Sequence, residues 1–316
     1  MSETQVTTAN TQGGPRYTYK RFNEQFPDDE ACLEWLKNRD YPNGIVCKVC
    51  QRVTKHHRIK GRKSFSCDSC GHHYHPTANT IFHKSSTSLH SWFYALYLMA
   101  STRCGISAKQ IEREVGVSYK TAWRMCKQLR KLLAEDGVML EGKVEVDETY
   151  YGGRPRRRGG KRGRGAEGKS IVVGLVQRKG RIRPVKADNI SSATLTGLVR
   201  EHVMPRSTVY TDELSGYARL GTMGYEHKRI HHASKVYVTG EGDIHTNTIE
   251  GFWSLLKRGI GGVYHAVSHK YLQAYLDEYA FRYNHREDAD PMVLTMLGQI
   301  WWSEPHAPML HGSPAQ

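Results

Sequence analysis

The spacing of apolar residues changes near residue 143, from a helical repeat to a strand repeat. Before that point the apolar side chains gather on one face of each segment, which predicts helices over residues 28–41, 89–101, 108–115 and from 119 onward. After it, segment 143–150 (KVEVDETY) alternates and segment 171–177 (IVVGLVQ) is apolar and β-branched. Both patterns are typical of strands. The chain therefore combines a helical first part with a second part that contains a sheet.

Three more strands are predicted over residues 182–187, 207–211 and 225–231, and a helix over about 191–203 separates the third strand from the fourth. The resulting order is three strands, helix, strand, helix, strand and helix. This order fits a mixed α/β sheet of the RNase H type. We therefore expect an α/β fold in which helices cover a mixed five-stranded sheet.

The last predicted helix begins near His245 (HTNTIEGFWSLLKRGIGGVYHAVS) and is amphipathic. Its apolar stripe has the spacing of a core-facing helix and consists of Ile249, Phe252, Trp253, Leu256 and Ile260. The neighbouring stripe carries Asn247, Glu250, Ser254 and Lys257. Glu250 and Lys257 therefore point the same way at the edge of the covered surface. They either share a ligand or form a solvated rim without function.

The charge balance favours a polyanionic partner. Lys and Arg outnumber Asp and Glu by 46 to 31, which gives a formal net charge of +15 and a pI near 9.5. Nucleic acid is the first expectation, and a basic peripheral membrane protein is the rival. No apolar run approaches the ~18 residues of a spanning helix, and residues 1–15 lack a signal-peptide pattern. We expect a cytoplasmic, nucleoid-associated protein.

Four of the seven cysteines form two CxxC pairs that are separated by sixteen residues. Two such pairs can surround zinc with four thiolates and hold together a module that is too small for its own core. The predicted zinc ligands are Cys47, Cys50, Cys67 and Cys70. The alternatives are four free thiols, or a site in which a histidine replaces a cysteine, the candidates being His72, His73 and His75.

Residues 106–133 resemble a helix-turn-helix. The first helix covers 108–115, Gly116 and Val117 form the turn, and Ser118 caps the second helix. The outer side of the second helix is expected to carry the residues that meet bases and phosphates, namely Tyr119, Lys120, Thr121, Arg124, Lys127 and Arg130. The alternative is a helical hairpin that belongs to a bundle.

Between the first two strands, residues 152–169 (GGRPRRRGGKRGRGAEGK) contain eight Lys or Arg residues and seven glycines. No core can form from this composition, so the segment is either a solvated linker or a mobile arm that binds phosphates. We favour the arm because the segment lies beside carboxylates. Its candidate DNA contacts are Arg154, Arg156, Arg157, Arg158, Lys161, Arg162 and Arg164.

Three carboxylates can converge in the predicted sheet. Asp147 lies in the first strand, Asp212 ends the fourth, and Glu250 faces out from the final helix. Carboxylates this close repel one another unless divalent cations lie between them, and two Mg2+ ions about 4 Å apart suit in-line displacement at a phosphodiester. Lys257 is placed to hold a phosphate. Other acids are expected to support this site or to lie on the strand surface: Glu145, Glu148, Asp188 and Glu213.

With these motifs, the chain resembles the DDE transposases of bacterial insertion sequences, in particular the zinc-ribbon-bearing branch related to Merlin elements. The matching stretches are the CxxC pairs, VEVDETYYGG, VYTDE and the segment that runs from HTNTIEGFW to RYNHR. The resemblance implies an RNase H-like domain in which Asp147, Asp212 and Glu250 bind Mg2+ or Mn2+. It also implies that Lys257 is the basic residue after the acid. Some relatives use the asparagine of HTN, so Asn247 is the alternative third ligand.

The resemblance implies a transposase that binds terminal inverted repeats, cuts the element ends and joins the 3′ hydroxyls to target DNA, as a homodimer or larger assembly. The alternatives are a nuclease or resolvase of the same fold that does not join, and a zinc-ribbon regulator with an inactive domain. The expected regions are a disordered tail (1–16), a helical segment (17–45), a zinc ribbon (46–84), a helix-turn-helix region (85–138), the catalytic domain (139–290) and a C-terminal tail (291–316).

Overall fold

The computed structural model describes residues 17–135, 137, 139–152, 169–230 and 247–300. The chain divides into two compact units, residues 1–101 with 287–316, and residues 102–286. Three expectations lie outside the described residues: the disordered tail 1–16, the basic arm 153–168 and the chain after residue 300.

The first unit has a helical core made by α1 (Tyr19–Gln25), α2 (Asp29–Asp40), α3 (Leu89–Ser101) and α9 (Met292–Gly298). Helix α3 contacts both α2 and α9. The Arg39 side chain of α2 donates hydrogen bonds to the carbonyl oxygens of Leu297, at 2.9 Å, and of Gly298 at the end of α9. The prediction of a tail from residue 291 was therefore wrong. Val293, Met296 and Leu297 are buried, and this short apolar run forms a helix because α3 covers it.

The cysteine-rich part of this unit is a ribbon of short antiparallel strands. Strand β1 (Val46–Cys47) pairs with β2 (Arg52–Val53). A second sheet has the order β3 (His56–Arg58), β4 (Phe65–Cys67) and β5 (His73–Tyr74). The predicted zinc-ribbon architecture is confirmed.

The second unit begins with the helix pair α4 (Ala108–Val115) and α5 (Tyr119–Lys131). Ser107 and Ser118 cap the two helices, since their hydroxyls accept hydrogen bonds from the backbone N of Gln110 and Thr121. Gly116 ends α4 with φ of +71°, a conformation that glycine adopts without strain. The region predicted over 85–138 is split between the units. Its α3 packs in the first, whereas α5 contacts α8 (Leu272–Asn284) in the second.

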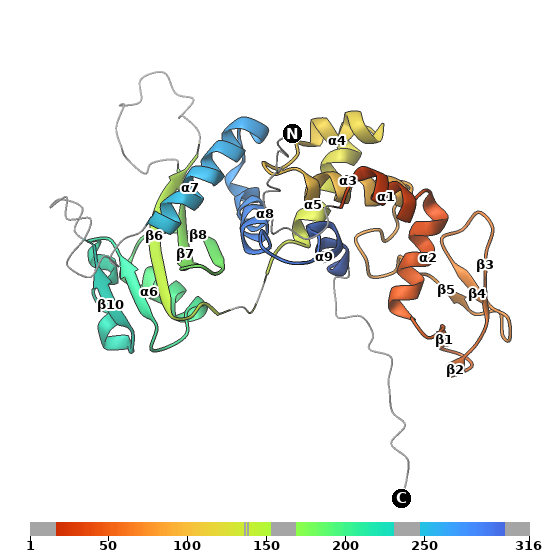
Figure 1. Ribbon diagram of the computed structural model, residues 1–316, viewed down its shortest axis with the longest axis horizontal. Helices are drawn as coiled ribbons and strands as arrows, with labels where there is room; N and C mark the ends of the chain where they lie inside the picture. The colour runs from red at the N-terminus through yellow and green to blue at the C-terminus, as the bar shows by residue number, and fades with distance from the viewer. Residues whose placement is uncertain (1–16, 136, 138, 153–168, 231–246, 301–316) are drawn as a thin grey trace, which may run out of the picture. The chain divides into compact units, whose positions relative to one another are not determined.

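The sheet of the second unit has five strands in the order β10-β9-β6-β7-β8 (Figure 1). Strands β6 (Lys143–Tyr151), β7 (Ser170–Gln177) and β8 (Ile182–Ala187) are antiparallel neighbours. Strand β9 (Thr208–Thr211) runs parallel to β6, and β10 (Glu226–Arg229) runs parallel to β9. The predicted mixed five-stranded sheet of the RNase H type is confirmed.

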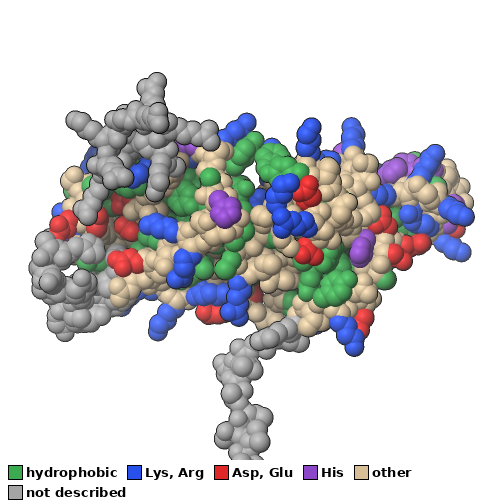
Figure 2. Space-filling model, turned by 90° about the horizontal axis from the view of Figure 1, so that it is seen from above, with side chains coloured by type: hydrophobic (Ala, Val, Ile, Leu, Met, Phe, Trp, Pro, Cys, Tyr) green, Lys and Arg blue, Asp and Glu red, His purple; other side chains and the backbone are tan. Residues whose placement is uncertain are grey.

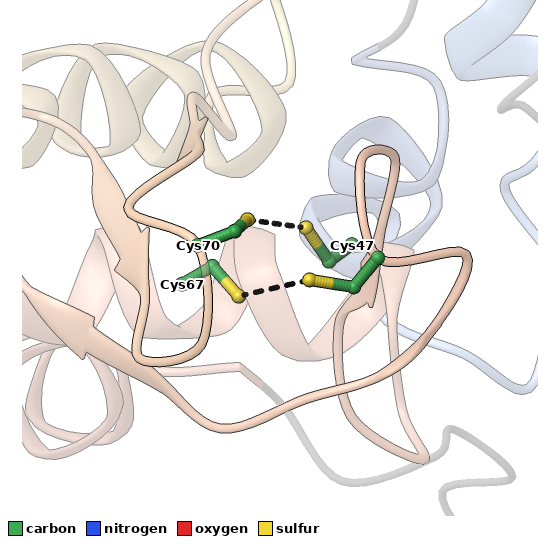
Figure 3. Close-up of side chains that lie close together, drawn as sticks. Cys47, Cys67 and Cys70 are labelled. Carbon is green, nitrogen blue, oxygen red and sulfur yellow. Dashed lines mark hydrogen bonds between the residues drawn. The ribbon is translucent and has the colours of Figure 1, made fainter.

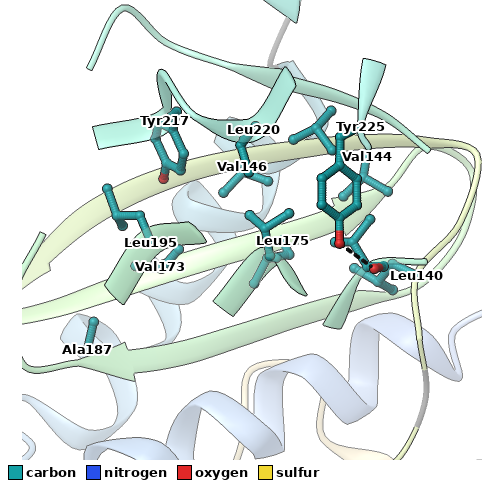
Figure 4. Close-up of a cluster of buried hydrophobic side chains, with 13 residues drawn as sticks. Leu140, Val144, Val146, Val173, Leu175, Ala187, Leu195, Tyr217, Leu220 and Tyr225 are labelled. Carbon is teal, nitrogen blue, oxygen red and sulfur yellow. Dashed lines mark hydrogen bonds between the residues drawn. The ribbon is translucent and has the colours of Figure 1, made fainter. Parts of the chain in front are cut away.

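Each face of this sheet buries a separate apolar core. One core lies under α6 (Ser192–His202) and includes Val146, Leu195 and Val199 (Figure 4). The other lies under α7 (Asn247–Gly259) and α8. The expected helix between the fourth and fifth strands consists of two short 3-10 turns, Ser215–Tyr217 and Leu220–Met223. After α7 come a π-helical turn (Ile260–Tyr264) and a 3-10 turn (His269–Tyr271).

Candidate active site and metal centres

Two acids come from adjacent strands: Asp147 lies in the middle of β6, and Asp212 directly follows β9. The parallel register of β6 and β9 pairs Val144 with Val209 and Glu145 with Tyr210. When this register is extended by two residues, Asp147 lies opposite Asp212, which follows the last residue of β9. The parallel pairing of β6 and β9 therefore brings the two predicted aspartates close together.

Among the described residues, Asp147, Glu148 and Asp212 form an acidic cluster, with one carboxylate oxygen of each within 4.8 Å of the others. Ligand oxygens around one Mg2+ lie roughly 3–4 Å apart, so small side-chain movements would let these three acids share an ion. The donor set is all oxygen, which suits Mg2+ and Mn2+. From the sequence, Glu148 was expected to support the site or to lie on the strand surface. Its position beside Asp147 was the available signal.

Asp147 faces helix α7. The indole Nε1 of Trp253 donates a hydrogen bond to its Oδ2 at 2.9 Å. Burial raises the pKa of Asp147, and the nearby charges of Asp212 and Glu250 raise it further, while the Trp253 hydrogen bond acts in the opposite direction. A cation bound here would remove this unfavourable charge.

Glu148 lies on the opposite face of β6, toward the core under α6. Burial raises the pKa of Glu148 to about 7, with Asp212 and Asp147 adding to the effect, and the hydroxyl of Tyr217 opposes it. The pKa of Tyr217 is in turn raised well above its ordinary value by burial and by Glu148. The side chains of Asp147 and Glu148 thus extend from opposite faces of β6.

Helix α7 has the two stripes that its sequence predicts. The apolar stripe is buried in full: Ile249, Phe252, Trp253, Leu256 and Ile260. The polar stripe is exposed: Asn247, Glu250, Ser254 and Lys257. Glu250 lies outside the acidic cluster, yet it is near enough to Asp147 to raise the pKa of that carboxyl. Two turns separate Glu250 from Lys257 on the same exposed side.

Helix α7 can approach β7 closely because the strand carries a glycine there. Gly174 pairs with Asp147 across the strands. A Cβ at Gly174 would lie 2.6 Å from both Ile249 Cδ1 and Trp253 Cζ2, closer than real contacts permit. The missing side chain leaves room for the Trp253 ring, whose Nε1 reaches Asp147.

The ribbon provides a second candidate metal centre. The sulfur atoms of Cys47 and Cys70 are 3.5 Å apart, and those of Cys50 and Cys67 are 3.9 Å apart (Figure 3). Four thiolates that bind one zinc at about 2.3 Å lie roughly 3.8 Å from one another. A hydrogen bond from the Thr54 hydroxyl, aided by the backbone N–H groups of Ser69 and Cys70, lowers the pKa of the Cys67 thiol and so favours the thiolate that binds zinc. The four cysteines fit a structural zinc.

The predicted DNA contacts of α5 are exposed in part. Lys120 and Arg124 are exposed, as is Tyr119. The exposed Lys127 ammonium lies 5.5 Å from the centre of the Trp123 ring, within the same helix. Arg130 was expected on the outer side, and this is wrong: it is only 5% exposed and its Nε donates to Glu278 Oε2 at 2.7 Å. An ion-pair partner on α8 draws it into the core.

Lys and Arg side chains project from much of the face that Figure 2 shows, as the net charge of +15 leads one to expect. The seven basic residues of the arm between β6 and β7 lie outside the described part of the chain.

Two family models match the chain, one over the cysteine-rich ribbon and one over the sheet that carries the acidic cluster. Residues 27–73 match the transposase zinc-ribbon domain, and residues 139–284 match the ISXO2-like transposase domain. A protein in the transposable element ISH50 of Halobacterium salinarum is 30% identical over 275 residues, which is 81% of this chain and 91% of the relative. The chain belongs to the ISXO2-like transposase family. It is thus a DNA transposase with an N-terminal zinc ribbon.

A transposase-like protein of Haemophilus influenzae is 32% identical over 109 residues, or 34% of this transposase and 85% of the relative. Among solved structures, the Mos1 strand transfer complex has a TM-score of 0.28 at 12% identity, covering 66% of this chain and 74% of that one. A simian T-cell lymphotropic virus intasome in complex with a PP2A regulatory subunit also has a TM-score of 0.28 at 12% identity, with coverages of 58% and 64%. At these scores the likeness adds nothing to the family assignment.

Within the part of the transposase that the structure describes, no helix combines the length and the apolar character needed to cross a membrane.

Proposed function

We propose that this transposase binds the terminal inverted repeats of its own element, hydrolyses the phosphodiester at each end and joins the freed 3′ hydroxyls to target DNA. The observation that carries the proposal is the meeting of Asp147 on β6 with Asp212, directly after β9, and with Glu250 close by on α7. Carboxylates gathered in this way suit metal-assisted phosphoryl transfer.

The metal ligands in this proposal are Asp147, Asp212 and Glu250, and Asn247 is the alternative to Glu250. Mg2+ or Mn2+, two ions per site, would supply an activated oxygen nucleophile and stabilise the leaving 3′ oxygen. Glu148 would contribute a further carboxylate at the same site. Exposed Lys257, two turns beyond Glu250, would hold a phosphate of the bound strand.

DNA binding would use three basic regions of the chain. The zinc ribbon and the exposed side chains Tyr119, Lys120, Arg124 and Lys127 would contact the element end. The arm with Arg154, Arg156, Arg157, Arg158, Lys161, Arg162 and Arg164 would contact phosphates. Because two ends must be brought together, the working form would be at least a homodimer on DNA, acting in the cytoplasm at the nucleoid.

Two assays test the proposal. In the first, the purified transposase and Mg2+ are mixed with DNA that carries the element end in its own flanking sequence, and nicked products are measured. In the second, pre-cleaved ends are mixed with a target plasmid, and joined products are measured. We expect both activities, and expect Asp147→Asn to lose both while it still binds the end.

Other outcomes would favour the rival functions. Cleavage without joining would indicate a nuclease or resolvase of the same fold. Specific binding of the ends by the unchanged chain, with neither activity under Mg2+ or Mn2+, would indicate a DNA-binding regulator with an inactive catalytic domain.

A further inference from the structure

Glu145 lies two residues before Asp147 on β6, and both side chains face α7 because alternate residues of a strand share a face. Its side chain is fully buried. The backbone N of Thr248 and of Ile249 each donate to Glu145 Oε2 at 3.0 Å, and the Thr248 hydroxyl donates to Oε1 at 3.0 Å. These amides belong to the first turn of α7, where N–H groups have no partner within the helix. The negative carboxylate also suits the positive end of the helix dipole.

The same carboxylate binds the cation Arg178. Arg178, directly after β7, donates from Nε to Glu145 Oε1 at 2.8 Å. The guanidinium carbon of Arg178 lies 4.1 Å from the centre of the Tyr210 ring on β9. Tyr210 is itself the register partner of Glu145. Glu145 therefore binds α7 directly and is connected to β9 through Arg178, which packs on Tyr210.

In each of these three segments, a candidate metal-binding acid follows two residues after the residue that takes part in this network. The pairs are Glu145 and Asp147, Tyr210 and Asp212, and Thr248 and Glu250. We propose that Glu145 is a positioning residue for the metal site, which fixes the start of α7 against the strands so that the three acids meet. This inference rests on the proposed function, because it takes these acids to be the metal ligands.

An apolar side chain at position 145 could fill the space but could not accept these hydrogen bonds. It would leave the amides of Thr248 and Ile249 without partners, and it would leave the Arg178 guanidinium, which is largely buried, without its carboxylate. Burying an ion pair is often no more stabilising than apolar packing, so stability alone does not favour Glu145. Directed hydrogen bonds instead fix the position of α7 along β6, and so the distance from Glu250 to Asp147.

The test measures metal binding without catalysis. Trp253 donates to Asp147, so the paramagnetic ion Mn2+ bound at this carboxylate should quench its fluorescence. The full-length chain is titrated with Mn2+, and the signal of a Trp253→Phe variant is subtracted. Amide hydrogen exchange of peptides that cover residues 247–252 reports on the start of α7. Thermal unfolding reports on stability.

Glu145→Gln is compared with Glu141→Gln, which removes an exposed acid just before the same strand. We expect Glu145→Gln to raise the Mn2+ concentration for half-maximal quenching by at least about tenfold, as for other residues that orient metal ligands. Exchange at 247–252 should quicken, and high Mn2+ should restore much of the cleavage rate. Glu141→Gln should match the parent chain in each measurement.

Thr248→Val is the second variant, in case Glu145→Gln does not fold. It removes the hydrogen bond from the Thr248 hydroxyl to Glu145 but keeps the two backbone N–H donors, so it is expected to raise the half-maximal Mn2+ concentration by less than Glu145→Gln does, roughly threefold. A loss of stability with an unchanged Mn2+ titration in the variants that fold would overturn the positioning role. If Asp147→Asn also leaves the quenching unchanged, the proposed metal site fails instead.

Discussion

Trp253 on α7 donates its indole N–H to the carboxylate of Asp147 on β6, at 2.9 Å. This hydrogen bond connects a residue of the apolar stripe of α7 to one of the candidate metal ligands. The same tryptophan ring packs over Gly174, the partner of Asp147 on β7. Packing of α7 and placement of Asp147 are therefore parts of one arrangement.

Trp253→Phe is expected to keep the fold and weaken the metal site. The Trp253 hydrogen bond lowers the pKa of Asp147, so its loss raises that pKa further and lets protons compete better with the cation. Hydrogen bonds to charged groups contribute about 1.5–3 kcal/mol, so the Mg2+ needed for half-maximal cleavage should rise roughly tenfold. The increase should be larger at pH 6 than at pH 8. An equal increase at both values would argue against this proton competition.

Gly174→Ala is expected to lower the free energy of unfolding by about 1–3 kcal/mol, because its methyl group would collide with Ile249 and Trp253. Cleavage should fall in parallel as α7 is pushed away from Asp147. Gly197→Ala on α6 is the matched control, since open space surrounds that position. In a helix interior it should be neutral or stabilise the chain by up to ~1 kcal/mol. Denaturant unfolding of both variants checks this, and similar stability for the two would show that α7 can shift without cost.

Glu250→Gln is expected to lower both cleavage and joining by at least about a hundredfold, the scale of removing one charge-stabilising group from an active site. A carboxylate offsets metal charge better than the neutral oxygen of Asn247, so Asn247→Ala should retain measurable activity. Two backbone amides at the start of α7 are already bonded to Glu145, so Asn247 is not needed to cap them. Assays with Mg2+ measure both variants, and the reverse ranking would assign Asn247 as the third ligand.

The purified chain is expected to contain about one zinc per monomer when it is prepared without chelator. Replacing Cys47 and Cys50 by Ser should remove the zinc and unfold the ribbon, because the short strands around it have little core of their own. End binding should weaken while the sheet of the second unit stays folded. Metal analysis and circular dichroism measure these effects. A folded ribbon without metal would contradict the assignment.

The buried Glu278 of α8 predicts a pH dependence of stability. Burial by itself would raise its pKa, but the guanidinium groups of Arg130 and Arg282 outweigh burial and hold the pKa of Glu278 below its ordinary value of 4.5. A lowered pKa in the folded state stabilises the fold above the unfolded pKa, and this stability is lost as the pH falls through the folded value. Glu278→Gln leaves two buried cations and should cost about 3–5 kcal/mol at pH 7.

The difference between the parent chain and Glu278→Gln should therefore shrink as the pH is lowered from 7 to below 4.5. Thermal unfolding across this range measures it. Asp277→Asn, at the neighbouring and only partly exposed position of α8, gives a comparison in which one carboxylate is removed outside this buried ion-pair cluster. A constant difference for Glu278→Gln would show that the ion pairs are not the source of its stability.

The sequence by itself determined helices α2 to α7 and the five strands of the second unit, since local spacing decides them. The alternation of β6, the cap Ser118 and the buried stripe of α7 all follow from short-range patterns. The cysteine spacing likewise predicted the ribbon, because two CxxC pairs can surround one zinc, and the four sulfur atoms do lie together.

Tertiary structure decided which residues meet. Glu148 and Asp147 lie near Asp212 only because β9 pairs with β6 and ends beside it. Arg130 is buried because Glu278, 148 residues later in the chain, lies opposite it, and α9 forms where α3 covers it. The burial of Glu145 against α7 likewise depends on partners more than a hundred residues away. Such contacts depend on how distant segments pack, and no local pattern of apolar and polar residues records that packing.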